Sequence, residues 1–257
     1  MMLPWLLGMA AVNLIPLTDK PVAKPDPPRL TMVWPWVVEA DSKTECLLRG
    51  GALGPTTRVS LVPTPSGKHN PDPLQVLEKP KDFALPDGMD AKANGNQVMR
   101  VELGSDTSPG DAILRVEGDN NTQSELPLEI TKTKLIRDAE PNNDLETAQT
   151  AGPLPARILG TIPKPQDCDC FRLELTQGQK LRVQVITRRK GSLLDPILTI
   201  QQPDGSLWKT AGPPPKAEDL VVITTAHQTG PVCLVVRDAF DSGSPMHGYE
   251  LRLELVE

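Results

Sequence analysis

Two short acidic stretches mark the point at which the character of this chain changes: Asp-Ala-Glu-Pro-Asn-Asn-Asp at residues 138–144 and Asp-Cys-Asp-Cys-Phe at residues 167–171. The sequence before them is irregular and rich in proline, and the sequence after them alternates between apolar and polar residues. Alternate side chains of an extended segment point to one side, and a proline favours extended geometry in the residue before it. Each stretch is therefore predicted to present several side-chain oxygens on one side.

These oxygens are of the kind that a hard cation binds. Calcium takes six to eight oxygen ligands from carboxylates and amides. In the alternative interpretation, Asn142 and Asn143 form Asx turns, and the acids are solvated or pair with Arg137 and Arg172 at the surface, which contributes about 0–1 kcal/mol. The candidate calcium ligands are Asp138, Glu140, Asn142, Asn143, Asp167 and Asp169.

The alternation that follows predicts a β-sandwich. Phe171, Leu173 and Leu175 are expected to face its core, and Gly178 and Gly205 stand where hairpin turns need a positive φ. No apolar stripe with a helical period longer than two turns interrupts the pattern. The expected strands are residues 156–162, 170–175, 180–186, 197–201, 207–210, 220–225, 232–237 and 249–256.

Residues 29–134 also read as a β-sandwich, with short alternating segments between glycine and proline turns. The passage 63–95 is polar, contains many prolines and shows few strand signals. Residues 131–137 are expected to be a short hinge between the two domains. The expected strands of this half are residues 30–34, 44–49, 58–62, 97–103, 112–117 and 126–130.

The beginning of the sequence carries different signals. Residues 1–17 are apolar and are similar to the hydrophobic part of a signal peptide, although they lack a basic start. They are too short to predict a stable membrane span. Residues 18–28 read as a Pro-rich linker. An extracellular context allows disulfides, and we expect either Cys168 or Cys170 to pair with Cys233, which leaves Cys46 paired to the remaining cysteine or free.

Composition and motifs exclude several functions. The net charge of −6 gives no electrostatic footprint for nucleic acid. The chain has no His-Glu-x-x-His, Gly-x-Ser-x-Gly or phosphate-binding glycine motif. His69, His227 and His247 all read as solvated loop residues. The chain is therefore not expected to be an enzyme.

An ordered series of motifs in residues 139–257 resembles the bacterial pre-peptidase C-terminal domain. That family is a small secreted β-sandwich, often attached to extracellular proteases and not itself catalytic, so the resemblance implies a jelly-roll-type fold. It also implies that the acidic and amide residues at 138–143 and at 167 and 169 correspond to a calcium site. The motifs include Glu-Pro-Asn-Asn at 140–143, Ile-Leu-Gly-Thr-Ile at 158–162, Asp-x-Asp-x-Phe at 167–171, Pro-Asp-Gly at 203–205 and Tyr-Glu-Leu-Arg-Leu at 249–253.

Residues 29–134 resemble immunoglobulin-like modules of large secreted bacterial proteins. The expected fold is thus all-β, with two β-sandwich domains at residues 29–134 and 138–257, immunoglobulin-like and then jelly-roll-type. The expected function is that of a secreted, periplasmic or cell-surface accessory protein, stabilised by calcium, that binds a protein or an extracellular polymer. Two alternatives remain: a detached accessory part of a secreted protease system, and an architectural spacer of a cell-surface protein.

Overall fold

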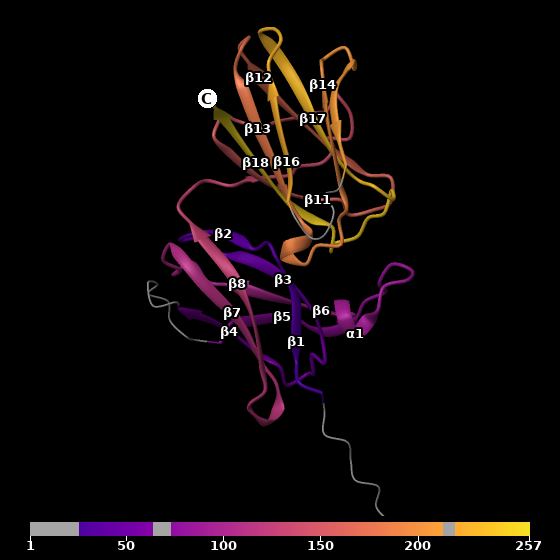
Figure 1. Cartoon of the computed structure of the whole chain (residues 1–257). Helices are drawn as coiled ribbons and strands as arrows, with labels where there is room; N and C mark the ends of the chain where they lie inside the picture. Colours follow the sequence, from indigo (N-terminus) through magenta and orange to yellow (C-terminus); the bar gives the residue numbers. More distant parts are fainter. Residues whose placement is uncertain (1–25, 64–72, 213–218) are drawn as a thin grey trace, which may run out of the picture.

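The computed structural model describes residues 26–63, 73–212 and 219–257, and these fold into two β-sandwiches that follow one another along the chain (Figure 1). The signal-like segment 1–17 and most of the linker 18–28 lie outside the described residues. The predicted all-β fold class is confirmed. The only helices of the described residues are short: α1 (Ala91–Asn94) and the 3-10 turns η1 (Asp119–Asn121) and η2 (Arg188–Lys190).

The first sandwich has the strand order of an immunoglobulin domain. Its strands are β1 (Arg29–Trp34), β2 (Val37–Glu39), β3 (Thr44–Gly51), β4 (Arg58–Pro63), β5 (Gln75–Asp82), β6 (Gln97–Leu103), β7 (Gly110–Glu117) and β8 (Gln123–Thr131). One sheet has the order β1-β3-β6-β5 and the other β2-β8-β7-β4. With β1 and β2 as the two halves of strand A, these orders read A-B-E-D and A′-G-F-C, which is the constant-type immunoglobulin pattern.

Two strands of this sandwich were not expected from the sequence. β2 has three residues and follows the chain's change of sheet at Pro35. β5 lies within the polar passage 63–95, at the edge of its sheet, and most of its side chains are exposed. An edge strand tolerates the proline at position 80 and needs no apolar face. This is why its sequence carries no alternation.

The second sandwich is a jelly roll with two short added strands. Its strands are β9 (Ile136–Arg137), β10 (Gln149–Thr150), β11 (Ala156–Thr161), β12 (Cys168–Leu175), β13 (Lys180–Ile186), β14 (Pro196–Gln201), β15 (Leu207–Ala211), β16 (Leu220–Thr225), β17 (Gly230–Asp238) and β18 (Gly248–Val256). The sheets have the orders β10-β12-β17-β14-β15 and β16-β13-β18-β11-β9. The chain alternates between the two sheets from β11 to β14 and again from β16 to β18, as in jelly rolls. All eight strands expected in this half are present, with ends that differ by at most two residues.

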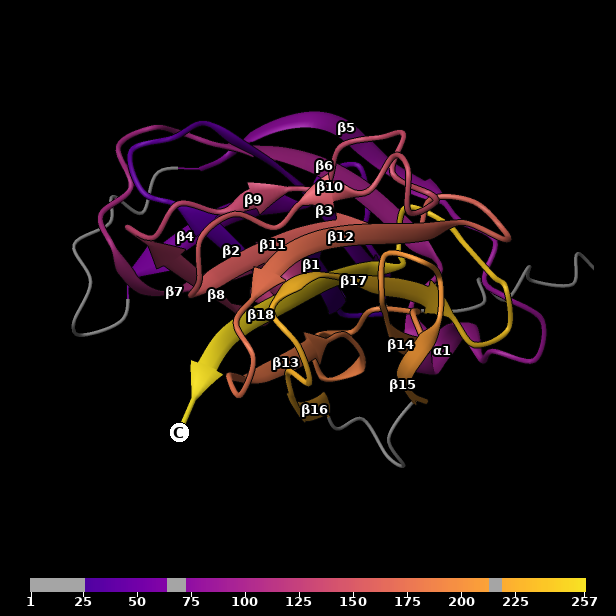
Figure 2. The same ribbon diagram turned by 90° about the horizontal axis from the view of Figure 1, so that it is seen from above.

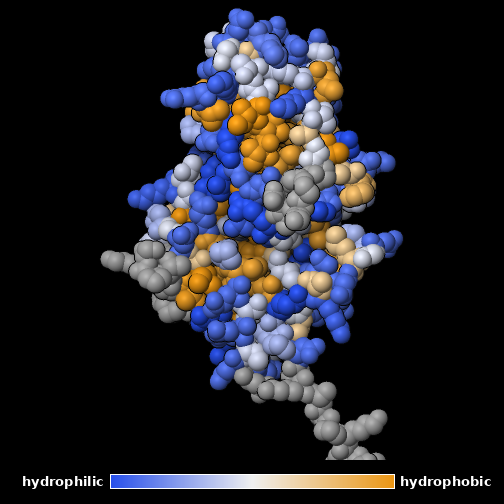
Figure 3. Space-filling model, viewed as in Figure 1, coloured by the Kyte–Doolittle hydropathy of each residue, from blue (hydrophilic) through white to orange (hydrophobic). Residues whose placement is uncertain are grey.

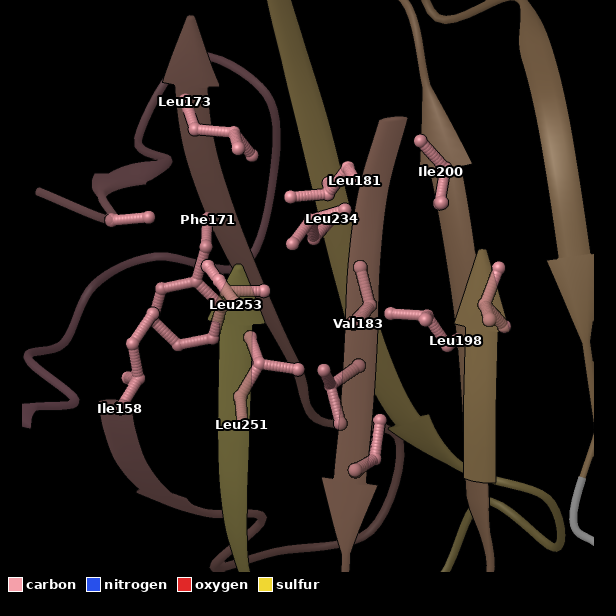
Figure 4. Packing of buried hydrophobic residues seen from close by; sticks show 14 of the residues in the cluster. Ile158, Phe171, Leu173, Leu181, Val183, Leu198, Ile200, Leu234, Leu251 and Leu253 are labelled. Atoms are coloured by element: carbon pink, nitrogen blue, oxygen red, sulfur yellow. The ribbon is translucent and has the colours of Figure 1, made fainter. Parts of the chain in front are cut away.

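Aliphatic side chains from both sheets fill the core of this sandwich (Figure 4). Phe171, Leu173 and Leu175 are buried, as predicted. Each such side chain contributes roughly 1.5–3 kcal/mol on burial. Gly178 and Gly205 have φ angles of 86° and 80° and turn their hairpins as expected.

A third apolar cluster joins the two sandwiches, and we call it the junction. Its members come from both halves of the chain: Met32, Trp36, Val37, Leu47, Val98, Leu135, Leu159, Ile186, Leu193 and Met246. Figure 1 shows the second sandwich above the first, and Figure 2 looks down on the molecule from the side of the second sandwich. The approach is close at Gly248, where an added Cβ would lie 2.5 Å from Trp34 Cδ2.

The junction overturns the expectation of a hinge at residues 131–137. Leu135 is 3% exposed within the junction, and Ile136–Arg137 forms β9, which pairs with β11. Leu135 N also donates a hydrogen bond to Glu39 Oε1 at 2.9 Å. The connection is therefore packed against both sandwiches.

Apolar side chains gather on one face of the second sandwich, near β16 (Figure 3). Alternation on β16 buries Leu220 and Val222 in the core and leaves Val221 and Ile223 exposed. β16 is an edge strand of its sheet. Within the described residues, the structure contains no helix with the length and apolarity needed to cross a membrane.

Candidate functional site: a buried acid cluster

Backbone hydrogen bonds bring the two acidic stretches together. Residues 138–144, which we call the acidic segment, run between β9 and β10. Asp138 N donates to Leu159 O at 2.9 Å, and Cys170 N donates to Asn142 O at 2.8 Å. The segment is thereby fixed to β11 at its beginning and to β12 in its middle, and its side chains meet those at the start of β12.

Three of the predicted ligands converge at this point. Carboxylate oxygens of Asp138, Glu140 and Asp169 all lie within 4.8 Å of one another. Asp169 is completely buried, and the neighbouring Asp167 is 5% exposed. We call these four carboxylates the acid cluster. Lys164 Nζ lies 3.9 Å from Asp167 Oδ1, but the lysine is exposed, so this pair contributes little.

Burial and mutual repulsion perturb the cluster strongly. Burial, together with the charges of Asp138, Asp167 and Glu140, raises the pKa of Asp169 to about 8 despite the hydrogen bond from Tyr249. Burial also raises the pKa of Asp138 to about 6, against a hydrogen bond from Asn142. The pKa of Asp167 is raised for the same main reason. A buried carboxylate without a positive partner is costly to ionise.

The two asparagines have different roles. Asn142 is completely buried, and its Nδ2 donates to Asp138 Oδ1 at 2.6 Å. Asn143, oriented by its hydrogen-bond partners, donates from Nδ2 to Asp167 Oδ1 at 3.1 Å and to Cys168 O at 2.8 Å. Asn142 thus contacts Asp138 of the acid cluster, whereas Asn143 contacts Asp167.

Three buried oxygens at this site have no hydrogen-bond partner among the described residues: Asn142 Oδ1, Asp167 Oδ2 and Asp169 Oδ1. Nearly all buried polar atoms in native proteins have a partner. These three unpartnered oxygens lie beside the converging carboxylates. Together they form a set of possible metal ligands that are all oxygen atoms, with no positive charge among them. This set fits calcium, which binds carboxylate and amide oxygens.

Sequence reasoning did not identify Tyr249 as part of this site. Its hydroxyl donates to Asp169 Oδ2, and the side chain is completely buried. Gly160 makes room for it, because an added Cβ there would lie 2.2 Å from the Tyr249 hydroxyl oxygen. A glycine in the middle of a strand often marks such a close approach. In the sequence, the signal for this close contact was Gly160 within the motif Ile-Leu-Gly-Thr-Ile.

The expected disulfide is not formed, and all four cysteines are free thiols. Cys168, Cys170 and Cys233 lie on the two paired strands β12 and β17. However, Cys170 is opposite Val235, and Cys233 is opposite Arg172. This register places no two cysteines directly opposite each other. Cys46 is buried in the core of the first sandwich.

Neither of the two described histidines belongs to the acid cluster. His247 was expected to be solvated, but it is 2% exposed, and its Nδ1 lies 2.8 Å from Ser244 Oγ. Burial lowers the pKa of His247. His227 is exposed and packs against Trp208, with ring centroids 5.2 Å apart. His69 lies outside the described residues. His247 is therefore a buried part of the fold.

Comparisons with known proteins find similarity in structure. No family model and no curated protein sequence matches this chain. The pre-peptidase C-terminal domain of a collagenase from Bacillus anthracis is similar, at 14% identity over 45% of this chain and 99% of that chain, with a TM-score of 0.34. The resemblance predicted from the sequence thus has a counterpart among solved structures.

Other similar structures have different names. PliG from Aeromonas hydrophila, a periplasmic inhibitor of g-type lysozyme, is 11% identical over 48% of this chain and 98% of that chain, with a TM-score of 0.32. SGBP-B from Bacteroides ovatus, solved with a mixed-linkage heptasaccharide, is 10% identical over 90% of this chain and 73% of that chain, with a TM-score of 0.30.

Proposed function

We propose that this chain is a non-catalytic binding or accessory protein of the extracellular space, periplasm or cell surface, and that its acid cluster binds one structural calcium ion. The observation that carries the calcium proposal is the convergence of three carboxylates, the buried Asp169, the half-buried Asp138 and the exposed Glu140, which have no cationic partner among the described residues. Like charges this close destabilise the fold unless a cation or protons neutralise them.

Each residue of the site has a role in this proposal. Asp138, Glu140 and Asp169 would hold the ion, and Asn142 Oδ1 and Asp167 Oδ2 would supply further oxygens. Asn143 and Tyr249 would not bind the ion themselves. Their hydrogen bonds would orient Asp167 and Asp169. A bound calcium would offset two of the negative charges of the cluster and tie the acidic segment to β12. Its effect is on stability, with no reacting group involved.

A purely architectural role is the second candidate, and the junction favours it. The junction buries side chains from both sandwiches, so the described part of the chain is expected to act as a single rigid body. A spacer of a cell-surface protein needs this rigidity and needs no ligand. An accessory part of a secreted protease system remains a third candidate, for which a neighbouring reading frame with a protease motif would be the supporting observation.

Calcium binding is tested by calorimetry and thermal melts of the full chain, with calcium, with magnesium and with chelator. At free calcium about 100 times Kd, linkage predicts roughly 2.7 kcal/mol of stabilisation. Asp169→Asn is expected to remove the calcium-dependent shift, because it deletes a converging carboxylate. Magnesium is expected to have a smaller effect, because it requires near-ideal octahedral geometry.

Asp144→Asn is the matched control. Asp144 belongs to the same segment but is exposed, and its Oδ1 accepts from Glu146 N and Thr147 N within a turn. It should keep the full calcium response. Equal responses of the two variants, or no calcium effect on the unmodified protein, would refute the site.

A further inference from the structure

A pocket of about 460 Å³ opens between the two sandwiches, beside the junction. The first sandwich contributes Thr31, Arg49 and residues of α1 to its wall, and the second contributes Arg188, Ser192 and neighbours in the loop of η2. Figure 1 shows the short orange coil of η2 at the end of the second sandwich that faces the first, and α1 lower down beside the first sandwich. The pocket shares no residue with the acid cluster. It is of the size that holds small ligands in other proteins.

Arg49 is the unusual residue of this pocket. It is 2% exposed, and its guanidinium is held by the pocket wall. Nε donates to Thr31 Oγ1 at 3.2 Å and to Asn94 O at 3.1 Å, and Nη2 donates to Gly191 O at 2.7 Å. The remaining nitrogen, Nη1, is buried and has no partner within the described chain.

The charge of Arg49 is also uncompensated. Burial lowers its pKa to about 10, and no carboxylate among the described residues forms an ion pair with it. The other arginine of the pocket, Arg188, is neutralised by both oxygens of Asp195. The pocket therefore carries one net positive charge. A buried guanidinium is costly without an anion, and its planar fork matches a carboxylate.

We propose that this pocket binds the carboxylate of a small organic monoanion through Arg49. A single negative charge balances the single unpaired positive charge, whereas a phosphate dianion would leave a second charge without a partner. The hydroxyls of Thr31 and Ser192 also line the pocket, but they donate to Asn94 O and Met246 O within the chain, so Arg49 is the group that is left to bind the ligand. The proposal is independent of the calcium site.

Calorimetric titration of the full chain tests the proposal with two carboxylate probes from different sources: D-glucuronate and N-acetyl-L-glutamic acid α-amide. The neutral counterparts are D-glucose and N-acetyl-L-glutamine amide. We expect saturable binding of at least one carboxylate probe at one site per chain and no binding of its neutral counterpart. Which probe binds distinguishes an acidic sugar from an acidic side chain. Inorganic phosphate should bind more weakly.

Two variants of α1 form a matched pair. Ala93 lines the pocket and Ala91 does not, although both are exposed on α1. Ala93→Glu places a carboxylate at the pocket and should abolish probe binding, whereas Ala91→Glu adds the same charge outside it and should leave binding unchanged. Arg49→Lys keeps the charge but loses Nη1 and should weaken binding about tenfold or more.

The proposal is overturned if neither carboxylate probe binds saturably, if a neutral counterpart or phosphate binds as tightly, or if Ala93→Glu and Ala91→Glu behave alike. Melting temperatures of the variants show that each is folded. The outcome of this titration can be told apart from that of the calcium experiment above, because chelator should not change the binding of the carboxylate probes.

Discussion

Two adjacent residues of β18, Tyr249 and Glu250, point into two very different charged environments. Strand alternation directs Tyr249 to the acid cluster within the second sandwich and Glu250 to the opposite face, toward the first sandwich. Both side chains are completely buried. The difference between the two environments shows which buried charges complete the fold and which require a partner from solution.

On the Glu250 side, every charge has a partner. Glu250 Oε1 pairs with Arg157 Nη2 at 2.7 Å and with Arg252 Nε at 2.6 Å, and Trp36 Nε1 donates to Oε2 at 2.9 Å. Arg157 also forms a two-pronged pair with Glu129 of the first sandwich. Burial raises the pKa of Glu250, but the hydrogen bond from Arg252 and the arginine charges outweigh it, and the pKa is lowered.

On the Tyr249 side, negative charges meet one another. Burial, together with the neighbouring carboxylates, raises the pKa of Asp169 to about 8. Equal burial thus gives opposite shifts, because arginines reach one carboxylate and acids surround the other. The ion pairs around Glu250 are complete within the chain, whereas the acid cluster needs a cation or protons.

The largest expected effect of a single substitution comes from breaking the complete side. Glu250→Ala leaves Arg157 buried with one partner fewer and leaves Trp36 Nε1 without an acceptor. Removing one partner of a buried ion pair costs about 3–5 kcal/mol. Chemical denaturation of the full chain measures this loss of unfolding free energy.

Glu254→Ala is the control on the same strand. Glu254 pairs with Arg182 at 2.8 Å, but its side chain is 47% exposed. The expected cost is about 0–1 kcal/mol. Similar losses of unfolding free energy for the two substitutions would show that the ion pairs of Glu250 stabilise the fold no more than an exposed pair does.

On the unpaired side we expect stability to depend on pH, by an amount that grows with the width of the pH window. In calcium-free protein the pKa of Asp169 lies at about 8 and that of Asp138 at about 6, both above the unfolded value of 3.8. The native state therefore binds more protons than the unfolded state between pH 4 and 8. Stability falls as pH rises through this window, by at most about 1.4 kcal/mol per pH unit and group.

Melts in chelator across this window, with and without Asp169→Asn, measure the effect. The variant should lose most of the pH dependence, since its amide does not titrate. Calcium should stabilise the unmodified protein more at pH 8 than at pH 5, because the ion competes with protons for the carboxylates. A calcium-free protein that is most stable at pH 8 would contradict the unpaired character of the cluster.

The smallest of the three effects concerns the space for Tyr249. Gly160→Ala places a methyl group 2.2 Å from the Tyr249 hydroxyl oxygen and must displace the ring from Asp169. Overpacking of this kind costs about 1–3 kcal/mol. Calcium affinity should fall as well, because Asp169 loses the group that orients it.

Gly212→Ala is the comparison, because an added Cβ there meets nothing within 4 Å. It should leave both melting temperature and calcium affinity nearly unchanged. If Gly160→Ala lowered stability but left calcium affinity intact, Tyr249 would be a packing residue with no part in the site.

Eight strands of the second sandwich, β11 to β18, were predictable because most of their side chains alternate between the core and the outer face, whereas β9 and β10, with two residues each, were not predicted. Arg172 and Glu174 alternate with Leu173 and Leu175 on β12, and such alternation is visible in a single sequence. β5 lacks that contrast, because both of its faces are mostly exposed, and so it could not be predicted.

The acid cluster was partly predictable, since its carboxylates fall on two short stretches whose spacing is local. Their meeting depends on backbone hydrogen bonds between the stretches, and the calcium assignment stays a prediction. The junction was not predictable, because its contacts join distant parts of the chain. Trp36 and Glu250 are 214 positions apart, and Leu135 and Met246 lie outside any strand.

The placement of Tyr249 and Glu250 on β18 also has a consequence for the order of folding. Of the strands β1 to β18, this one leaves the ribosome last, yet it supplies a partner to both buried charged regions. Before it docks, Arg157 lacks Glu250, and Asp169 lacks Tyr249. Contacts this distant in sequence form slowly. The nascent chain therefore passes through a state in which β11 and β13 lack the strand that lies between them in their sheet. Unpaired strand edges and exposed apolar surface make such an intermediate prone to aggregation.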